Sequence, residues 1–223
     1  MGVGMSQSIT QPVTHPVTHV VFDVGGVLLS HVRTWREAHL RTTVPWDDHF
    51  DTPEFMEITR PSVMDHMAGR LTPDEWFAMM EQLSEGRLTA EGARLVLEAW
   101  LDEDYPGIVQ LIDDIHAAGR VTATLSNTNP VHWEQALALS EALRRVQHLH
   151  ASHLLGAVKP DREIYEVFER TTGFPRAGLI FFDDLEENVL AARDAGWRAE
   201  HVDHAGNPAE QLREHLTRHG VFE

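Results

Sequence analysis

One lysine stands out among the cationic side chains of this sequence. The other seventeen are arginines, and Lys159 lies in the segment Gly156-Ala157-Val158-Lys159-Pro160. An ammonium group is a compact, rotatable point charge that suits a phosphate or a carboxylate, whereas a guanidinium is a rigid planar fork. A surface lysine left by drift in an arginine-rich sequence is the alternative, so the meaning of Lys159 depends on the groups that accompany it.

Other polar residues follow short apolar runs that predict buried strands. They are Asp23, the pair Ser126-Asn127 and the pair Asp183-Asp184. Ligands of an open parallel sheet bind beyond the carboxyl ends of its strands. Taken singly, each of these residues could be a turn cap, a helix N-cap or the acidic first turn of a helix. Their occurrence at several strand ends, together with the lysine, indicates one shared site.

Apolar runs and helical periodicity alternate along the chain. Strands are predicted at residues 19–22, 121–125, 179–182 and 197–202, with a further short strand near 149–153. Helices are predicted from Pro106 to Gly119, from about Pro130, after Pro160 and from about 187 to 195. This alternation predicts an α/β fold with a mostly parallel sheet that is covered by helices on both faces.

Residues 34–104 form a helical stretch that is too long for an ordinary crossover between strands. Thr72 is the predicted N-cap of a helix within it, and Pro73 the first helical residue. We therefore expect an inserted helical cap at 34–104 and a core formed by 19–33 and 105–223.

Two short segments are predicted to act as hinges of this cap, near His31–Arg33 and near Asp104–Gly107, so that it closes over the site. Trp35, His66 and Trp76 of the cap could be core residues or substrate contacts. Residues 1–18 are rich in Ser, Thr, Gln and Pro and are predicted to be a flexible N-terminal tail.

Composition restricts the partners of the protein. A net charge of −17 argues against nucleic acid and anionic membranes, and it requires any anion site to be built locally. No run of about 18 apolar residues and no signal peptide is present, which favours a cytoplasmic protein, either a monomer or a homodimer. Cysteine is absent, and the fifteen histidines are scattered without a zinc-binding pattern.

The groups at the strand ends are those that phosphoryl transfer needs. Carboxylates from two strand ends form a hard oxygen site that suits Mg²⁺. Together with the ammonium group of Lys159, such a cation would neutralise a phosphate, while the Ser126 hydroxyl and backbone N–H groups would hold its oxygens. Asp23, alone at the end of the first strand, is the natural nucleophile for an aspartyl-phosphate.

The order of these motifs resembles that of the haloacid dehalogenase superfamily. The resemblance covers about residues 19 to 203 and rests on four segments: Phe22-Asp23-x-Gly25-Gly26-Val27-Leu28, Leu125-Ser126-Asn127-Thr128-Asn129, Lys159-Pro160 and Phe182-Asp183-Asp184-x-x-x-Asn188. It implies a Rossmann-like three-layer core with a C1-type helical cap. Within the superfamily, the chain is most similar to the alpha-D-glucose-1-phosphate phosphatases and to the phosphatase domain of soluble epoxide hydrolases.

The resemblance also assigns roles to individual residues. Asp23 would be the nucleophile and a metal ligand, and Gly25 and Asp184 would supply a backbone carbonyl and a carboxylate to Mg²⁺. The phosphate would be bound by Ser126, Asn127 and Lys159. Asp183 would lie in or near the second coordination shell, and Asn188 would support the acidic loop.

Gly25 departs from the superfamily pattern. Most of its phosphatases have an aspartate at this position, which serves as general acid and base, a contribution of about 10²- to 10⁴-fold in rate. The departure implies a slower enzyme, a better leaving group such as a sugar 1-phosphate, or a substitute acid. His132 is the first candidate for that substitute, and a histidine on a helix surface is the alternative.

These residues predict a Mg²⁺-dependent phosphatase of a small organic phosphomonoester, with sugar phosphates as candidates. Two alternatives stay open: a protein that binds phosphorylated ligands with little or no turnover, and a dehalogenase that hydrolyses a carbon–halogen bond. The acidic pair Asp183-Asp184 disfavours the metal-free site of a dehalogenase. Phosphonate hydrolysis through a cap lysine is excluded, because residues 34–104 contain no lysine.

Overall fold

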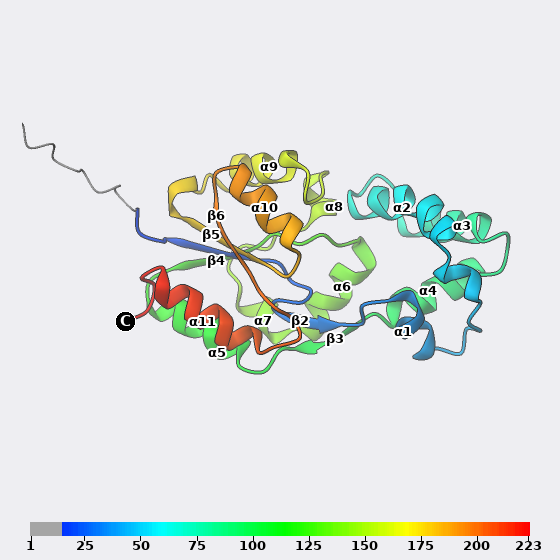
Figure 1. Ribbon diagram of the computed structural model, residues 1–223, viewed down its shortest axis with the longest axis horizontal. Helices are drawn as coiled ribbons and strands as arrows, with labels where there is room; N and C mark the ends of the chain where they lie inside the picture. Colours follow the sequence, from blue (N-terminus) through cyan, green and yellow to red (C-terminus); the bar gives the residue numbers. More distant parts are fainter. Residues whose placement is uncertain (1–14) are drawn as a thin grey trace, which may run out of the picture.

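The computed structural model describes residues 15–223. Its main sheet has four parallel strands in the order β4 (Val121–Thr124), β1 (His19–Phe22), β5 (Leu179–Asp183) and β6 (Arg198–His201). Helices cover both faces, as predicted: α9 (Arg162–Thr172) and α10 (Glu186–Asp194) on one, α5 (Ile108–Ala117) and α11 (Pro208–Arg218) on the other (Figure 1).

Alternate residues of the strands belong to two separate apolar cores. In β1, Val20 and Phe22 pack with the side chains of α5 and α11, whereas Val21 packs with those of α9 and α10. Successive side chains of a strand point to opposite faces, so a strand that is apolar throughout is buried on both sides. The continuous apolar runs of the sequence reflect this arrangement.

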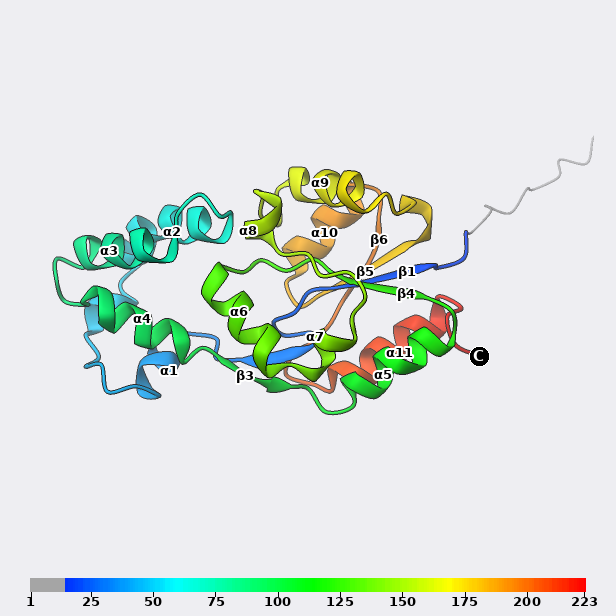
Figure 2. The same cartoon turned by 180° about the vertical axis from the view of Figure 1, so that it is seen from behind.

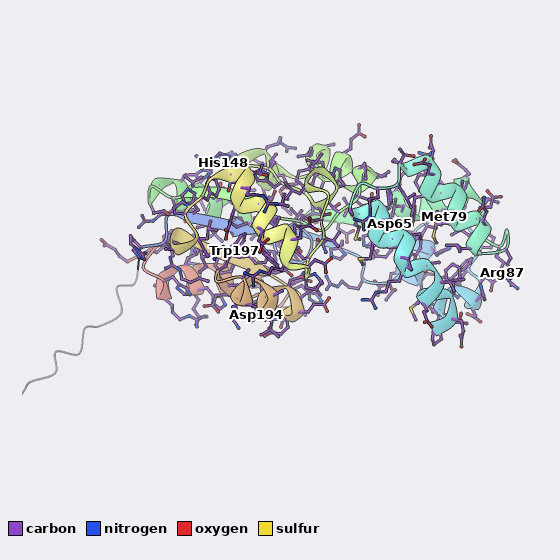
Figure 3. The ribbon with its side chains drawn as sticks, turned by 90° about the horizontal axis from the view of Figure 1, so that it is seen from above. Asp65, Met79, Arg87, His148, Asp194 and Trp197 are labelled. Carbon is purple, nitrogen blue, oxygen red and sulfur yellow. The ribbon has the colours of Figure 1, made fainter. Side chains whose placement is uncertain are left out.

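The helices between β1 and the rest of the sheet form a third apolar core. They are α1 (Trp35–Leu40), α2 (Pro53–Met67), α3 (Pro73–Leu83) and α4 (Ala90–Glu98), together with a short 3₁₀ helix at Asp48–Asp51. Figures 2 and 3 show this helical block at one end of the molecule, with Asp65 and Met79 far from Trp197 of the sheet region. Thr72 caps α3 in a reciprocal capping box with Glu75, and Pro73 is the first helical residue, as predicted.

A two-stranded antiparallel ribbon joins the helical block to the sheet. It pairs β2 (Leu29–His31) with β3 (Leu101–Asp104), so residues 101–104 are a strand, contrary to the helical prediction for 34–104. The periodicity of these short segments did not distinguish them from helix. The chain enters and leaves the helical block through this ribbon, next to the two segments predicted to be hinges.

The strand predicted near residues 149–153 is wrong. The chain passes alongside β4, but the hydroxyl of Thr124 forms hydrogen bonds with the backbone of His150. It donates to the carbonyl of His150 and accepts from the N–H of His150. The ladder is reduced to isolated bridges at His148 and Ala151, and the short helix α8 (Ser152–Leu155) follows.

Three further differences concern the ends of elements and the tail. Helix α5 begins at Ile108 rather than Pro106, because Gly107 turns the chain with a φ of 86°. Helices α6 (Pro130–Leu139) and α7 (Glu141–Arg145) divide at Ser140, and neither α7 nor α11 was predicted. Of the predicted tail, residues 1–14 lie outside the described residues, but Val17 is 1% exposed and belongs to the core. None of the helices in residues 15–223 has the length and apolar character needed to cross a bilayer.

Candidate active site

Lys159 lies at the centre of a buried cluster of charges. Its Nζ is 2.6 Å from Oδ2 of Asp183 and 3.1 Å from Oδ1 of Asp23, and its side chain is fully buried. Burial opposes the charge, but Asp183 and Asp23 outweigh burial and raise the pKa of Lys159. The ring of Phe181 lies 5.2 Å from the ammonium group and adds a cation–π contact. The lysine is therefore held as a buried, permanently charged cation.

Asn127 fixes the backbone that carries this lysine. Its Nδ2 donates to the carbonyl of Lys159, and its Oδ1 accepts from the N–H of Lys159, both at 2.8 Å. The side-chain amide of Asn127 is thus used within the protein. Of the expected phosphate-binding groups of Asn127, only its backbone N–H remains available for a ligand.

Asp183 ends β5 with both of its carboxylate oxygens engaged. Oδ2 accepts from Lys159, while Oδ1 accepts from the N–H of Leu185 and from Nδ2 of Asn188, each at 2.9 Å. Asn188 is itself held by the hydroxyl of Tyr165, which donates to its carbonyl at 2.8 Å. Asp183 therefore organises the loop after β5 and positions Lys159.

Asp23 ends β1 beside Asp183, because Phe22 pairs with Phe182 in the parallel ladder. It is 8% exposed, and its Oδ1 forms no hydrogen bond of good geometry within the described part of the chain. Burial raises the pKa of Asp23 to about 7; Lys159 opposes the rise, and Asp183 and Asp184 add to it. Asp23 and Asp183 share the single ammonium group of Lys159, so the charge of Asp23 is only partly offset.

The donor atoms fit a magnesium ion. One carboxylate oxygen from each of Asp23, Asp183 and Asp184 lies within 4.8 Å of the others. All three are hard oxygen donors, and Oδ1 of Asp23 is buried without a hydrogen bond. Because both oxygens of Asp183 are engaged, Asp23 and Asp184 are the carboxylates best placed to bind a cation directly.

Asp184 also meets Arg33 from the ribbon. Nη2 of Arg33 lies 2.7 Å from Oδ2 of Asp184, the oxygen that approaches the position of a Cβ at Gly26. Gly26 has a φ of 77°, so this position needs glycine both for its conformation and for the approach of the carboxylate. Gly26 thus allows the loop after β1 to approach Asp184 at the end of β5.

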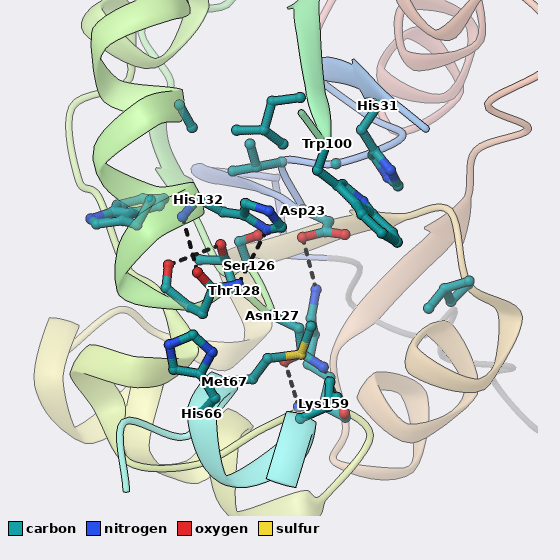
Figure 4. A pocket seen from close by; sticks show the side chains of 18 of the residues that line it. Asp23, His31, His66, Met67, Trp100, Ser126, Asn127, Thr128, His132 and Lys159 are labelled. Atoms are coloured by element: carbon teal, nitrogen blue, oxygen red, sulfur yellow. Dashed lines mark hydrogen bonds and ion pairs between the residues drawn. The ribbon is translucent and has the colours of Figure 1, made fainter. Parts of the chain in front are cut away.

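A cavity of about 470 Å³ opens from this cluster toward the helical block (Figure 4). Asp23, Ser126 and Lys159 lie at its floor, and the Ser126 hydroxyl forms no hydrogen bond with the described residues. Many of the other lining residues are aromatic or apolar: Trp35, Val63, Met64, Met67, Trp76, Leu97, Trp100 and Trp133. Polar side chains, among them Arg60, Asn129 and Glu187, interrupt this apolar surface.

Three residues of the helical block that the sequence singled out serve both as core and as cavity wall. Trp76 and His66 are 1% and 2% exposed and stack at 4.9 Å between ring centroids. Trp35 stacks on Trp76 at 6.1 Å, and all three line the cavity. A place in the core and a place in the cavity wall are therefore compatible for these residues.

His132 does not fit a general acid, although it lines the cavity. Its Nε2 is 2.8 Å from the carbonyl of Leu97, which can only accept, so Nε2 carries the hydrogen. Nδ1 then accepts from Nδ2 of Asn129 at 3.2 Å. Burial lowers the pKa of His132 to about 4, against the opposite effect of the bond to Leu97. The ring is neutral at physiological pH, and both of its nitrogens are occupied.

Sequence reasoning missed other residues of the cavity. His31, Arg33 and Trp100 reach it because β2 pairs with β3, and Figure 4 shows His31 and Trp100 among its lining. His31 and Arg33 were noted only as hinge positions. No local pattern marks them, because the pairing joins segments about 70 residues apart.

A family model of haloacid dehalogenase (HAD)-like hydrolases matches residues 17–196, and the chain belongs to this family. It is therefore a hydrolase, with the Rossmann-like α/β fold predicted from the sequence.

Individual relatives agree with this assignment. Phosphatase MT3486 of Mycobacterium tuberculosis (strain CDC 1551 / Oshkosh) is 27% identical over 218 residues, 91% of this chain and 95% of that protein. The HAD family enzyme bt-2542 of Bacteroides thetaiotaomicron, in complex with magnesium and inorganic phosphate, has a TM-score of 0.73 at 18% identity, covering 88% of this chain and 100% of that one. A HAD-like family hydrolase of Porphyromonas gingivalis has a TM-score of 0.71 at 23% identity, covering 91% and 98%. The two solved structures share the fold.

Proposed function

We propose that the protein is a Mg²⁺-dependent phosphatase that hydrolyses a small organic phosphomonoester through an aspartyl-phosphate on Asp23. The observation that carries the proposal is the buried group of Lys159, Asp23 and Asp183 at the floor of a cavity. A fixed cation beside the carboxylate of Asp23 suits an anionic phosphate and a nucleophile at once. The phosphatase among its relatives supports the same activity.

Different residues act in the first step, the transfer of the phosphoryl group to Asp23. A carboxylate oxygen of Asp23 bonds to phosphorus as the bond from phosphorus to the ester oxygen breaks. The electron pair leaves with the ester oxygen, which takes a proton from water to become the alcohol. Lys159 and the Ser126 hydroxyl hold the phosphate oxygens, helped by the backbone N–H of Asn127. Asp183 and Asn127 keep the ammonium group in place from opposite sides, one through Nζ and the other through the backbone.

The metal would be held by Asp23, Asp184 and the carbonyl of Gly25, with Asp183 and Asn188 behind them. When bound, Mg²⁺ supplies positive charge that lets the phosphate and the carboxylates approach one another. The magnesium and phosphate bound by the Bacteroides enzyme support this choice of cation.

The cavity supports a more specific substrate class than the sequence did. Its aromatic and apolar walls would bury a flat or apolar alcohol, whereas the hydroxyl groups of a sugar would lose hydrogen bonds to water there. We therefore place aryl and large alkyl phosphates ahead of sugar phosphates. The helical block would close over such a substrate by bending at the ribbon of β2 and β3.

Assays of phosphate release test this proposal. The purified chain is given sugar phosphates, aryl phosphates and alkyl phosphates, each with Mg²⁺ and with EDTA. We expect turnover only with Mg²⁺, and a higher kcat/KM for aryl phosphates than for sugar phosphates. Absence of metal-dependent release from every compound would refute the phosphatase.

Two alternatives have their own outcomes in the same assays. Tight binding of phosphate or vanadate without any turnover would indicate a phosphate-binding protein. Halide release from a 2-haloacid in EDTA would indicate a dehalogenase.

A further inference from the structure

Hydrolysis of an aspartyl-phosphate needs a group that takes a proton from the attacking water. Several polar side chains near Asp23 cannot do so. Lys159 is a charged donor between two carboxylates, Asp184 faces Arg33 and the proposed metal, and both ring nitrogens of His132 are occupied. Among the described residues of the cavity wall, His31 lies against Gly25, and its Nε2 is bonded only to the partly exposed Arg33.

The imidazole of His31 fills the space in front of Gly25. A Cβ added at Gly25 would lie 2.9 Å from both Cδ2 and Nε2 of this ring. Gly25 does not have the left-handed conformation that would itself require glycine. The absence of a side chain two residues after Asp23 is therefore matched by a ring from β2 that enters the same space.

Hydrogen bonds orient this ring. Nδ1 lies 2.6 Å from the carbonyl of Val32, which can only accept, so Nδ1 carries the hydrogen and Nε2 the lone pair. Nε2 accepts from Nη1 of Arg33 at 3.0 Å. The side chain of Arg33 is 33% exposed and is held by two contacts, with His31 and with Asp184. A cation bound to Asp184 would compete with Arg33 for that carboxylate. A water molecule would then replace Arg33 as the hydrogen-bond donor to Nε2 of His31.

We propose that His31 is the base that orients and deprotonates the water in the second step; this inference rests on the proposed phosphatase activity. The water oxygen bonds to phosphorus while the bond from phosphorus to the Asp23 carboxylate breaks, and its electron pair returns to Asp23. The water proton passes to Nε2 of His31 and is then released to solvent.

Rapid mixing with p-nitrophenyl phosphate and Mg²⁺ separates this step from the first. In His31→Ala, we expect a burst of about one nitrophenolate per enzyme, at a rate similar to wild type, followed by a steady rate that is 10²- to 10⁴-fold lower. The matched control is His219→Gln, which changes a histidine that is bound to Glu200 and does not line the cavity. It should behave as wild type.

A second pair of variants tests the shared space. Gly25→Asp should lower the steady rate of the wild-type chain, because its Cβ would displace the imidazole. In a His31→Ala background the new carboxylate has room, and Gly25→Asp should raise the steady rate at least tenfold above His31→Ala alone.

The outcomes separate the two proposals. An active wild type whose His31→Ala variant turns over normally, or loses burst and steady rate equally, would refute the role of His31 alone. Failure of Gly25→Asp to rescue His31→Ala would likewise overturn it. A wild type without turnover would refute the phosphatase itself and remove the basis of this inference.

Discussion

Replacing Asp23 by asparagine should abolish turnover and, without metal, make the fold more stable. Burial first, then the neighbouring Asp183 and Asp184, raise the pKa of Asp23 from its ordinary value of 3.8 to about 7, although Lys159 opposes them. In the unfolded chain this carboxyl loses its proton near pH 4, so between pH 4 and 7 folding requires the uptake of a proton. Stability therefore falls as the pH rises through this window.

The size of the effect follows from the pKa. At about 1.4 kcal/mol for each pH unit, the rise to about 7 corresponds to a cost of up to roughly 4 kcal/mol at pH 8. Asparagine has nearly the same shape and no charge, and Lys159 keeps its 2.6 Å contact with Asp183. In a chain of this length, 1 kcal/mol changes Tm by about 2–4 °C, so a gain of about 4 kcal/mol at pH 8 corresponds to roughly 8–16 °C.

Thermal and urea unfolding in EDTA at pH 4 and pH 8 measure this difference. Asp23→Asn should unfold near the wild-type midpoint at pH 4 and well above it at pH 8. The exposed Asp194→Asn is the matched control and should show no such change with pH. Mg²⁺ at 100 times Kd should stabilise the wild type by about 2.7 kcal/mol and so narrow the difference, because the variant lacks a ligand. A variant that is no more stable than wild type at pH 8 in EDTA would refute the picture of an uncompensated buried carboxylate.

Two further predictions concern Lys159. Lys159→Arg should lower kcat/KM by about tenfold or more, because a planar guanidinium does not fit the fully buried space between Asp23 and Asp183. Full activity in steady-state assays would mean that any cation suffices there. Asn127→Ala should lower kcat roughly tenfold and destabilise the fold by about 1–3 kcal/mol, since both backbone groups of Lys159 lose their partner. Unchanged kinetics and Tm in that variant would show that the lysine is positioned by other contacts.

Much of the core was predictable because its pattern is local. The runs at 20–22 and 179–182 are apolar throughout, which is typical of strands buried on both faces. Parallel strands carry their carboxyl ends to one edge, so Asp23 and the acidic pair had to lie close together wherever the helices packed. The capping box of Thr72 and Glu75 is equally local and was read from neighbouring residues.

The errors share a different cause. The segment near 149–153 was predicted as a strand, yet the N–H of His150 donates to the hydroxyl of Thr124 and the pairing with β4 is limited to isolated bridges. His132 was a plausible acid until the carbonyl of Leu97, from the helical block, fixed its hydrogen on Nε2. Each outcome depends on an atom that lies far away in sequence.

The sequence by itself determined which chemical groups meet at the end of the sheet, because the period of burial sets the strands and their parallel order aligns their ends. Only the tertiary structure decided what surrounds those groups. The pairing of β2 with β3 brings His31 in front of Gly25 and Arg33 onto Asp184, and the helical block supplies the aromatic walls of the cavity. Which side chain fills a given space is set by contacts between distant segments, and these leave no periodic trace in the sequence.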